Sequence, residues 1–415
     1  MEKVYDICCG IDVHKKILVA CLKTGSKHEI RETGATTREL LELADWLKEA
    51  GCQMTAMEST GSYWKPLYNV LELNGLSAMV VNAQHMKAVP GRKTDVSDAE
   101  WIADLVQHGL LRASYIPGKE QRELREMVRY RKSLVEDRTR ELNRLQKMLE
   151  GANIKLSGTV RDINGMSARN ILNCLVTGEQ IDEAKFDEMY DKKQIAHNLK
   201  APKSQILDDL NGIMTPLQRR VMKELLKHLD ELNEHIRNLN DEIDNFMKPE
   251  EKDAAAKIQE VTGIGNTSAQ VIISVIGTDM NRFPSDRHIS SWAGLCPGNN
   301  ESAGKRRSGK MRKGNMMLRS TLLVCAHSAV KVKDSYFYAQ YMRICAHRGK
   351  KRAVLAVAHS MLVAIYHILK DGVPFHDLGA DYYNHFNRES KINACLKKLK
   401  ALGWTEPSAT VAVPV

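Results

Sequence analysis

The chain has 415 residues, 43% of them hydrophobic, so two or three domains with ordinary cores are expected. Its net charge of +10 favours a polyanionic partner, nucleic acid before a membrane, although a merely basic protein would carry the same excess. The nine cysteines include no CxxC pair, which argues against a zinc site or a disulfide framework and indicates the reduced thiols of a cytoplasmic protein.

The start of the chain does not resemble a signal peptide. The longest apolar stretch, residues 353–369, is interrupted by His359, Ser360 and His367, so it predicts a buried helix rather than a membrane span. We therefore expect a cytoplasmic protein with no membrane partner.

Residues 1–115 alternate short apolar strands with helices, a pattern typical of an α/β layer fold. The first two strands are expected to form a hairpin, with Asp12 at the end of the first. The strands are predicted at residues 5–9, 17–22, 54–57 and 77–81, and the helices from Thr37 and over 64–73.

This region carries acidic residues at positions where α/β proteins commonly form ligand-binding or active sites. Asp12 and Glu58 each follow a predicted strand, at the sheet edge where α/β proteins bind ligands. Asp95 and Asp98 lie near the start of a helix running to Leu110, and their spacing places both on one face. Four converging carboxylates need cations between them, and Mg²⁺ prefers oxygen ligands. The alternative for Asp95 and Asp98 is ordinary helix N-terminal acids, favoured by the helix dipole.

The middle region, residues 116–255, predicts two long helices with apolar seams. They could pair antiparallel within one chain or between chains, as a spacer or a dimerisation arm, and the Arg-rich first helix could also follow a phosphate backbone. Between them, residues 153–216 predict short helices joined by polar turns. The first seam is Leu124, Val128, Val135, Leu142, Leu145 and Leu149, shared with Arg131 and Arg138; the second is Leu225, Leu229, Leu232, Ile236, Leu239, Ile243 and Phe246.

Residues 256–378 predict a mainly helical domain, followed by a tail, residues 379–415, without clear periodicity. Residues 258–273 fit a helix-hairpin-helix element, in which Gly263 and Gly265 form the turn and the second helix presents backbone N–H groups to a phosphate. A plain turn between two helices is the alternative.

The stretch 299–315 is rich in Gly, Ser, Lys and Arg and predicts a flexible basic loop leading into a helix near Asn315. Ser302 precedes its cations, so a hydroxyl stands beside groups able to hold a phosphodiester. The alternative is a solvated loop with an incidental serine. The candidate nucleic-acid-binding residues are Gly263, Gly265, Lys305, Arg306, Arg307, Lys310, Arg312 and Lys313.

Several separate motifs resemble, in the same order, the DEDD transposases of bacterial insertion sequences, the IS-one-ten family of bridge-RNA-guided serine recombinases. The chain is longer than compact members because of its middle insert. The motifs are residues 10–15 (GIDVHK), 57–61 (MESTG), 93–99 (KTDVSDA), 263–265 (GIG), Phe283, 292–295 (WAGL) and Glu301-Ser302.

The resemblance implies an N-terminal RuvC-like (RNase H-like) domain, a coiled-coil middle and a C-terminal transposase domain. It implies that Asp12, Glu58, Asp95 and Asp98 bind Mg²⁺ and that Ser302 is the nucleophile that forms a covalent phosphoserine–DNA intermediate. Implied partners are donor and target DNA, a structured non-coding RNA of the element, and further copies of the chain, as a dimer or a tetramer on DNA, in which domains of different protomers complete one active site.

Two other functions are consistent with the residues alone. A metal-only nuclease or Holliday-junction resolvase would use the four carboxylates and leave Ser302 as a loop residue. A nucleic-acid-binding protein with a degenerate site would need no catalysis, although intact acids at all four positions argue against it.

Overall fold

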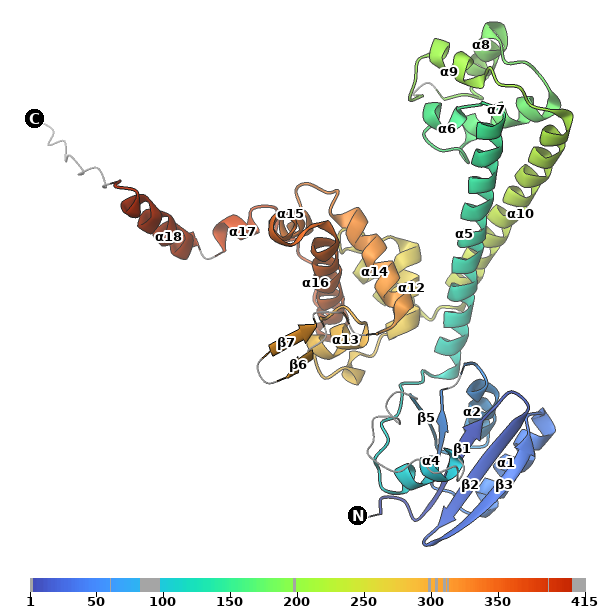
Figure 1. Cartoon of the computed structure of the whole chain (residues 1–415), viewed down its shortest axis with the longest axis vertical. Helices are drawn as coiled ribbons and strands as arrows, with labels where there is room; N and C mark the ends of the chain where they lie inside the picture. The colour runs from blue at the N-terminus through green and yellow to red at the C-terminus, as the bar shows by residue number, and fades with distance from the viewer. Residues whose placement is uncertain are drawn as a thin grey trace, which may run out of the picture. The chain divides into compact units, whose positions relative to one another are not determined.

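The computed structural model describes residues 3–59, 61–82, 98–196, 199–297, 300–302, 305–308, 311, 313–386 and 388–404 (Figure 1). They form two compact units, Met1–Gly118 and Lys119–Val415. The first unit is built on one mixed sheet, and the second is almost entirely helical.

The sheet of the first unit has the strand order β3-β2-β1-β4-β5. The strand β2 runs antiparallel to both β3 and β1, whereas β4 lies parallel to β1 and β5 lies parallel to β4. This arrangement fits the RuvC-like domain that the motifs imply. The strands are β1 (Ile7–Val13), β2 (Ile17–Thr24), β3 (Lys27–Gly34), β4 (Met54–Glu58) and β5 (Ala78–Val81).

Helices cover both faces of this sheet. On one face, α1 (Thr37–Glu49) and α2 (Trp64–Leu73) bury their leucines against alternate residues of the strands. On the other face, α4 (Asp98–Gln107) packs Ile102, Leu105 and Val106 against the remaining set. The α2 prediction is confirmed, whereas the cap of α1 is Thr36 rather than Thr37, because the Thr36 side chain accepts the Glu39 N–H.

The strand β3 was not predicted. Its sequence, KHEIRETG, is polar, and its residues are exposed or half-buried because it lies at the edge of the sheet. An edge strand needs neither alternating apolar residues nor a continuous apolar run, so the sequence carries little signal for it.

Two long helices, α5 (Lys119–Gly151) and α10 (Pro216–Phe246), pack along each other and form what we call the arm (Figure 1). Three contacts fix their direction: Arg131 bonds to Asn240, Arg138 to Asn233, and Glu141 to His228. Because the partner number falls as the α5 number rises, the helices are antiparallel and pair within one chain.

Charge favours this pairing. Residues 125–141 of α5 hold six Lys/Arg against four acids, and they lie beside residues 230–246 of α10, which hold six acids against one arginine. The apolar seam of α10 is buried as predicted from Leu229 to Ile243. Its ends differ from the prediction: Leu226 is buried and Leu225 half-buried, and Met247 is buried while Phe246 is exposed.

Between the two long helices, four short helices form a bundle with its own core, which we call the tip bundle. Its core includes Leu145 and Leu149 of α5 and Leu226 and Leu229 of α10, so the arm contributes to two separate cores. The predicted short helices are α6 (Leu156–Thr159), α7 (Met166–Thr177), α8 (Glu183–Asp191) and α9 (Lys203–Leu210).

A polar layer separates these two cores midway along the arm. Arg138 donates to Asn233 at 3.3 Å, and buried Glu141 lies 2.8 Å from His228 and 2.7 Å from Arg144. Within the described structure, Arg138 Nε and Glu141 Oε2 are buried without a hydrogen-bond partner. Such a layer disfavours any other register, because sliding would bury these charges against apolar side chains.

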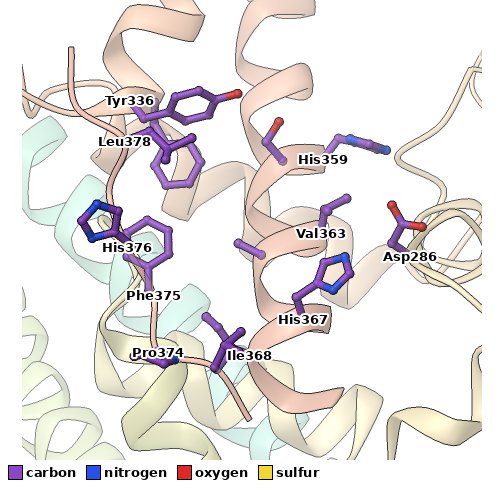
Figure 2. A pocket seen from close by; sticks show the side chains of 14 residues that line it. Asp286, Tyr336, His359, Val363, His367, Ile368, Pro374, Phe375, His376 and Leu378 are labelled. Atoms are coloured by element: carbon purple, nitrogen blue, oxygen red, sulfur yellow. The ribbon is translucent and has the colours of Figure 1, made fainter. Parts of the chain in front are cut away.

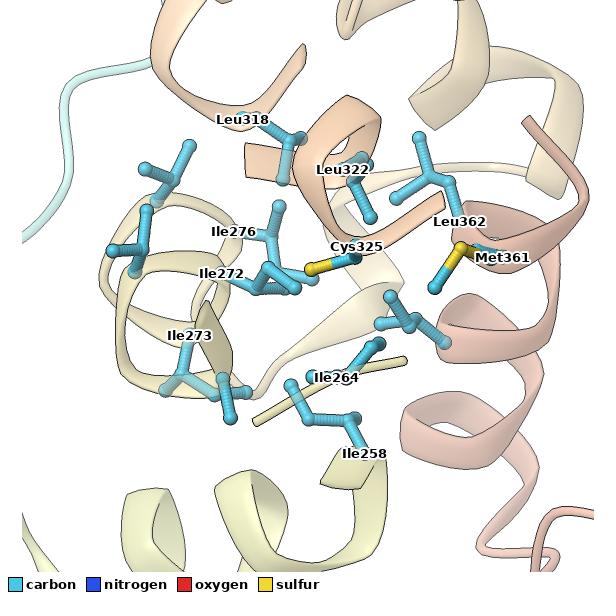
Figure 3. Close-up of a cluster of buried hydrophobic side chains, with 14 of the residues drawn as sticks. Ile258, Ile264, Ile272, Ile273, Ile276, Leu318, Leu322, Cys325, Met361 and Leu362 are labelled. Carbon is cyan, nitrogen blue, oxygen red and sulfur yellow. The ribbon is translucent and has the colours of Figure 1, made fainter. Parts of the chain in front are cut away.

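The rest of the second unit is a helical domain around one core, to which the root of the arm also contributes. Figure 3 shows isoleucines of α12 meeting Leu318, Leu322 and Cys325 of α14 and Met361 and Leu362 of α16. The elements are α11 (Pro249–Gln259), α12 (Asn266–Ile276), η1 (Met280–Arg282), α13 (Asp286–Trp292), β6 (Asn300–Ser302), β7 (Lys305–Ser308), α14 (Met316–Ala329), α15 (Tyr336–Arg348) and α16 (Lys350–Asp371).

Among the described helices, α16 is the one long and apolar enough to cross a membrane, but half of its apolar window is buried in this core, as the sequence predicted. Two further helices, α17 (Tyr382–His385) and α18 (Arg388–Ala401), lie in the predicted tail. The prediction missed α18 because its apolar residues are interspersed with Arg and Lys and, as at Ile392 and Leu399, are exposed.

Candidate catalytic and nucleic-acid-binding sites

Asp12 and Glu58 lie side by side near the carboxyl ends of two adjacent inner strands of the sheet. They directly follow Ile11 and Met57, which are paired across the parallel strands β1 and β4. Side chains alternate between the faces of a sheet, so Asp12 lies on the same face as Gly10, and Glu58 on the same face as Ala56. Gly10 pairs with Ala56, and this shared face is the one that α4 covers.

The helix α4 approaches this face closely enough to add a third carboxylate. A Cβ atom on Gly10 would lie 2.3 Å from both Ala99 O and Ala103 N, so the backbone of α4 rests directly on β1. Asp98 is the first residue of α4 and adjoins Ala99. We call Asp12, Glu58 and Asp98 the acidic edge. Asp95, the fourth predicted acid, lies outside the described residues.

The surroundings of the acidic edge are partly open to solvent. The Asp12 side chain is 22% exposed and its Oδ2 lies 3.1 Å from Nε2 of His14, while Glu58 and Asp98 are half-buried. No three His, Cys, Asp or Glu side chains of the described residues are grouped tightly enough to hold a metal ion. The donors themselves are hard carboxylate oxygens on one face, the ligand type that Mg²⁺ prefers, so their chemistry fits that ion.

Ser302 lies in a β-hairpin, where the sequence predicted a flexible loop. It ends β6 and pairs with Lys305 at the start of β7, and a shift of register follows Asn300. The prediction failed because the stretch contains few apolar residues and no alternating apolar pattern that would mark a strand. Lys305, Arg306 and Arg307 lie on β7 and Lys313 just beyond it, whereas Lys310 and Arg312 lie outside the described residues.

The base of this hairpin is held by backbone contacts. Pro297 and Met311 form an antiparallel bridge, and Asn315 N donates to Trp292 O at 3.3 Å. A Cβ atom on Gly314 would lie 2.3 Å from Gly294 N, so only glycine allows this approach. The predicted helix then begins at Met316, where the Asn315 side chain accepts the Leu318 N–H at 3.0 Å. These contacts hold the base of the hairpin, and Ser302 lies at its opposite, turn end, where it pairs with Lys305.

The two glycines of the predicted hairpin between α11 and α12 have different roles. Gly263 has φ +91°, and a Cβ there would lie 2.6 Å from Cys325 O, so it is needed for packing against α14. Gly265 caps α12 with an ordinary φ of −96°, and no atom lies within 4 Å of the position its Cβ would take. Neither backbone nor neighbours require glycine at 265, which leaves the N-terminus of α12 open.

Two arginines of α5 attach α12 to the arm. Arg125 donates to the carbonyls of Ser274 and Val275 at the C-terminal end of α12. Arg131, 2% exposed, donates to Thr267 O at 3.2 Å near its N-terminal end and also to Gln270. Burial lowers the pKa of Arg131, against the carboxylate of Asp244. The sequence placed Arg131 on the seam but gave no signal of these partners, which are more than 100 residues away.

The sequence also missed an open trough over α16, where His359 and His367 lie (Figure 2). It noted these histidines only as interruptions of an apolar run. Their spacing with Val363, four residues from each, was the signal of a second, partly exposed helix face.

Comparison with known proteins agrees with the motifs. A DEDD-type family model of IS110 elements, described as a transposase, matches residues 9–154. A second model, described as "Transposase IS116/IS110/IS902 family", matches residues 255–342. This family is the IS-one-ten family of the resemblance above.

Two curated relatives align with most of the chain. The "Transposase for insertion sequence element IS1111A" of Coxiella burnetii is 23% identical over 330 residues, covering 77% of this chain and 78% of the relative. The "Probable family 20 transposase" of Pseudomonas aeruginosa is 25% identical over 326 residues, covering 78% of this chain and 80% of the relative. Both alignments extend beyond either single family model.

Proposed function

Because this chain belongs to the IS110 family of DNA transposases, whose DEDD type implies dependence on a divalent metal, we propose that it cuts and rejoins DNA with a serine nucleophile and a Mg²⁺-binding acidic edge. The observation that carries the proposal is the position of Asp12 and Glu58 on neighbouring parallel strands, on the face where α4 begins with Asp98. Carboxylates at such an edge repel each other unless a cation lies between them.

Asp12, Glu58, Asp95 and Asp98 would hold Mg²⁺, with His14 contacting Asp12 from outside. When bound, the ion supplies positive charge that stabilises the phosphoryl oxygens in the transition state. The carboxylates of the chain have two further tasks. They position the ion at the edge of a rigid sheet, and one of them can accept a proton from an attacking hydroxyl.

Ser302 is the proposed nucleophile. Its Oγ attacks the phosphorus of a DNA phosphodiester and loses its proton to a carboxylate or to water. The bond from phosphorus to the deoxyribose oxygen breaks, and that oxygen leaves as a hydroxyl after taking up a proton. Rejoining reverses these steps: a DNA hydroxyl attacks the phosphoserine, and the serine regains its proton. The bond energy is kept throughout, so no external energy source is needed.

Cations near Ser302 would hold the DNA backbone during this exchange. Lys305, Arg306 and Arg307 belong to the strand that pairs with β6, and we include Lys310, Arg312 and Lys313 in the same proposed surface. Their charge opposes the negative charge that develops on the phosphorus oxygens. The open α12 N-terminus at Gly265 supports a second phosphate contact, so we propose that α11 and α12 act as a helix-hairpin-helix.

Specificity would come from a structured non-coding RNA of the element. The basic surfaces of this chain are numerous, and none of the described elements is a zinc finger or an obvious base-reading helix. Base pairing by the RNA with donor and target DNA would then select the sequences, while the protein contacts backbones. We place such a complex in the cytoplasm at the nucleoid.

We propose that the chain forms a homo-oligomer, either a dimer or a tetramer on DNA. The interface between copies would lie on a different surface from the predicted apolar seam. We treat the arm as an antiparallel coiled coil within one chain, so its seam is already covered. At the start of α10, Leu217 and Val221 follow at four-residue spacing and are 70% and 42% exposed, and Ile213, which is 85% exposed, lies just before the helix. This stripe supports an interface between copies.

The test of the nucleophile is a trapping experiment with Ser302→Ala and Ser302→Cys. Wild-type protein incubated with its element RNA, both DNAs and Mg²⁺ should yield protein covalently attached to a strand end, seen as a shifted band on a denaturing gel. The Ser302→Ala protein should bind DNA as well as wild type does but give no covalent band. Cleavage by Ser302→Ala at the wild-type rate would favour the metal-only nuclease instead.

The test of RNA guidance compares natural and altered RNA. Changing the pairing loops should redirect the DNA that is cut, and RNA-free protein should show little preference between the natural site and random duplex. A large preference without RNA would mean that the protein reads DNA by itself.

A further inference from the structure

A trough of about 450 Å³ crosses one face of α16 in the C-terminal domain. In Figure 2 the helix carries His359, Val363 and His367, a segment of extended chain flanks one side, and Asp286 lies on the other. We call this segment, residues 373–378, the strap. The trough shares no residue with the acidic edge, the Ser302 hairpin or the hairpin at Gly263.

The floor and one wall of the trough are apolar and flat. Val363 and Ala364 form part of the floor, and their short side chains leave it deep. Phe375 of the strap stacks on Phe337 with ring centroids 6.0 Å apart and planes within 10°. Tyr336 meets Phe337 edge-on at 5.7 Å. Aromatic faces next to an apolar floor suit a flat ring better than a branched aliphatic group.

Polar groups converge on this apolar surface from both sides. Asp286 and His359 lie on one side, and His376 of the strap lies on the other (Figure 2). Burial lowers the pKa of His359, against a raising effect from Asp286, and so favours the neutral imidazole. A neutral imidazole donates from one nitrogen and accepts at the other. The described residues that line the trough include no Lys or Arg. The trough therefore disfavours a phosphate and suits a neutral ring with mixed donors and acceptors.

The strap is tied to the hairpin that we propose binds phosphate. Asp377 accepts from Thr262 Oγ1 at 3.3 Å and from Tyr336 N at 2.8 Å. Phe375 N donates to Glu260 Oε2 at 3.1 Å. Thr262 directly precedes Gly263, and Glu260 lies three residues before it. A wall of the trough is therefore continuous with a surface offered to a nucleic-acid backbone.

From this chemistry and continuity we propose that the trough receives one unpaired nucleobase of a bound strand. The base lies against the Phe375 ring of the strap, above Val363 and Ala364, with an edge toward His359 and Asp286. An exocyclic amine, as on adenine or cytosine, would donate to the Asp286 carboxylate. Cutting and rejoining of duplexes exposes unpaired bases, and aromatic pockets hold such bases in other nucleic-acid-binding proteins. The inference rests on DNA binding by this transposase but not on Ser302 or on guidance by RNA.

The test uses full-length protein and a single-stranded oligonucleotide carrying one 2-aminopurine, whose emission falls when it stacks on aromatic rings. Two variants fill the trough, Ala364→Phe and Val363→Phe. The control, Val324→Phe, adds the same ring on the 63% exposed surface of α14. Circular-dichroism melting identifies any variant that fails to fold, and the other filling variant then carries the result.

Wild type and the control should quench the emission, whereas the filled variants should quench less and bind the single strand about tenfold more weakly, the order of one lost base stack. Duplex binding should be equal in all proteins. The proposal would be overturned if folded filled variants quenched the emission as much as wild type does. It would also be overturned if these variants lost self-association without any change in quenching, because that result would indicate a groove that docks another protein. Failure of wild type to bind duplex would instead count against the proposed function.

Discussion

The closest backbone approach in the first unit gives a sharp test of how the acidic edge is positioned. Replacing Gly10 by alanine would place a Cβ atom 2.3 Å from Ala99 O and Ala103 N. Ordinary van der Waals contact needs about 3.4 Å, so α4 would have to move by about 1 Å away from β1. Asp98 begins α4 and would move with it, whereas Asp12, two residues from Gly10 on the same strand, would stay in place.

Two effects of different size follow from this displacement. Overpacking of this kind costs about 1–3 kcal/mol of unfolding free energy, which leaves the domain folded. A shift of about 1 Å in a catalytic group can lower the reaction rate by about a hundredfold. We therefore expect Gly10→Ala to lose far more DNA cleavage than stability, and to bind Mn²⁺ more weakly in calorimetry.

The matched control is Gly118→Ala, because no atom lies within 4 Å of the position that its Cβ would take. Unfolding in urea, Mn²⁺ binding and the single-turnover cleavage rate should be measured for both variants. If Gly10→Ala matched the control in all three, α4 would not rest on β1 in the way that positions Asp98.

Three further predictions follow. Gly314→Ala would place a Cβ atom 2.3 Å from Gly294 N, so it should displace the Ser302 hairpin. The covalent protein–DNA band should then disappear while DNA affinity changes little. A normal yield of that band would contradict the role of the hairpin base. Arg131→Met should lower the free energy of unfolding in urea by about 3 kcal/mol because its buried partners lose their donor, against less than about 0.5 kcal/mol for the exposed Lys132→Met. Equal effects would refute the attachment of α12 to the arm by Arg131. The Cβ of Gly265→Ala would meet no atom of the described residues, so this change should leave stability unchanged but weaken duplex binding in fluorescence anisotropy. Unchanged binding would remove this contact from the proposal.

The sequence predicted the parts of the fold that apolar residues mark. Four of the five strands in the sheet of the first unit, both long helices and the α11–α12 hairpin each carry such a pattern. The edge strand β3 and the basic helix α18 have no buried apolar side chain and left no pattern. At the ends of the α10 seam, Leu225 and Leu226 are equally apolar, and only the packing of the tip bundle decides which of them is buried.

Whether each candidate site could be predicted from the sequence also depends on such local patterns. Asp12 and Glu58 could be predicted because short strands end at them, and parallel pairing then brings them to one edge. The ordered hairpin at Ser302 could not, since it depends on Gly314 meeting Gly294, a contact that no local pattern records. The trough could not be predicted for a similar reason, because α13, α15, α16 and the strap all contribute to it.

The polar layer of the arm also bears on how relatives of different length can arise. An insertion of one or two helical turns in α5 alone would move Arg138 away from Asn233 and Glu141 away from His228. The same insertion in α10 would restore both contacts, so length changes between the layer and the arm's root should occur in matched pairs. Beyond the layer, the tip bundle has its own core. It could be shortened, enlarged or replaced as a unit without disturbing the end of the arm that packs into the core of the C-terminal domain. The insert predicted from the sequence, residues 153–216, corresponds to that part.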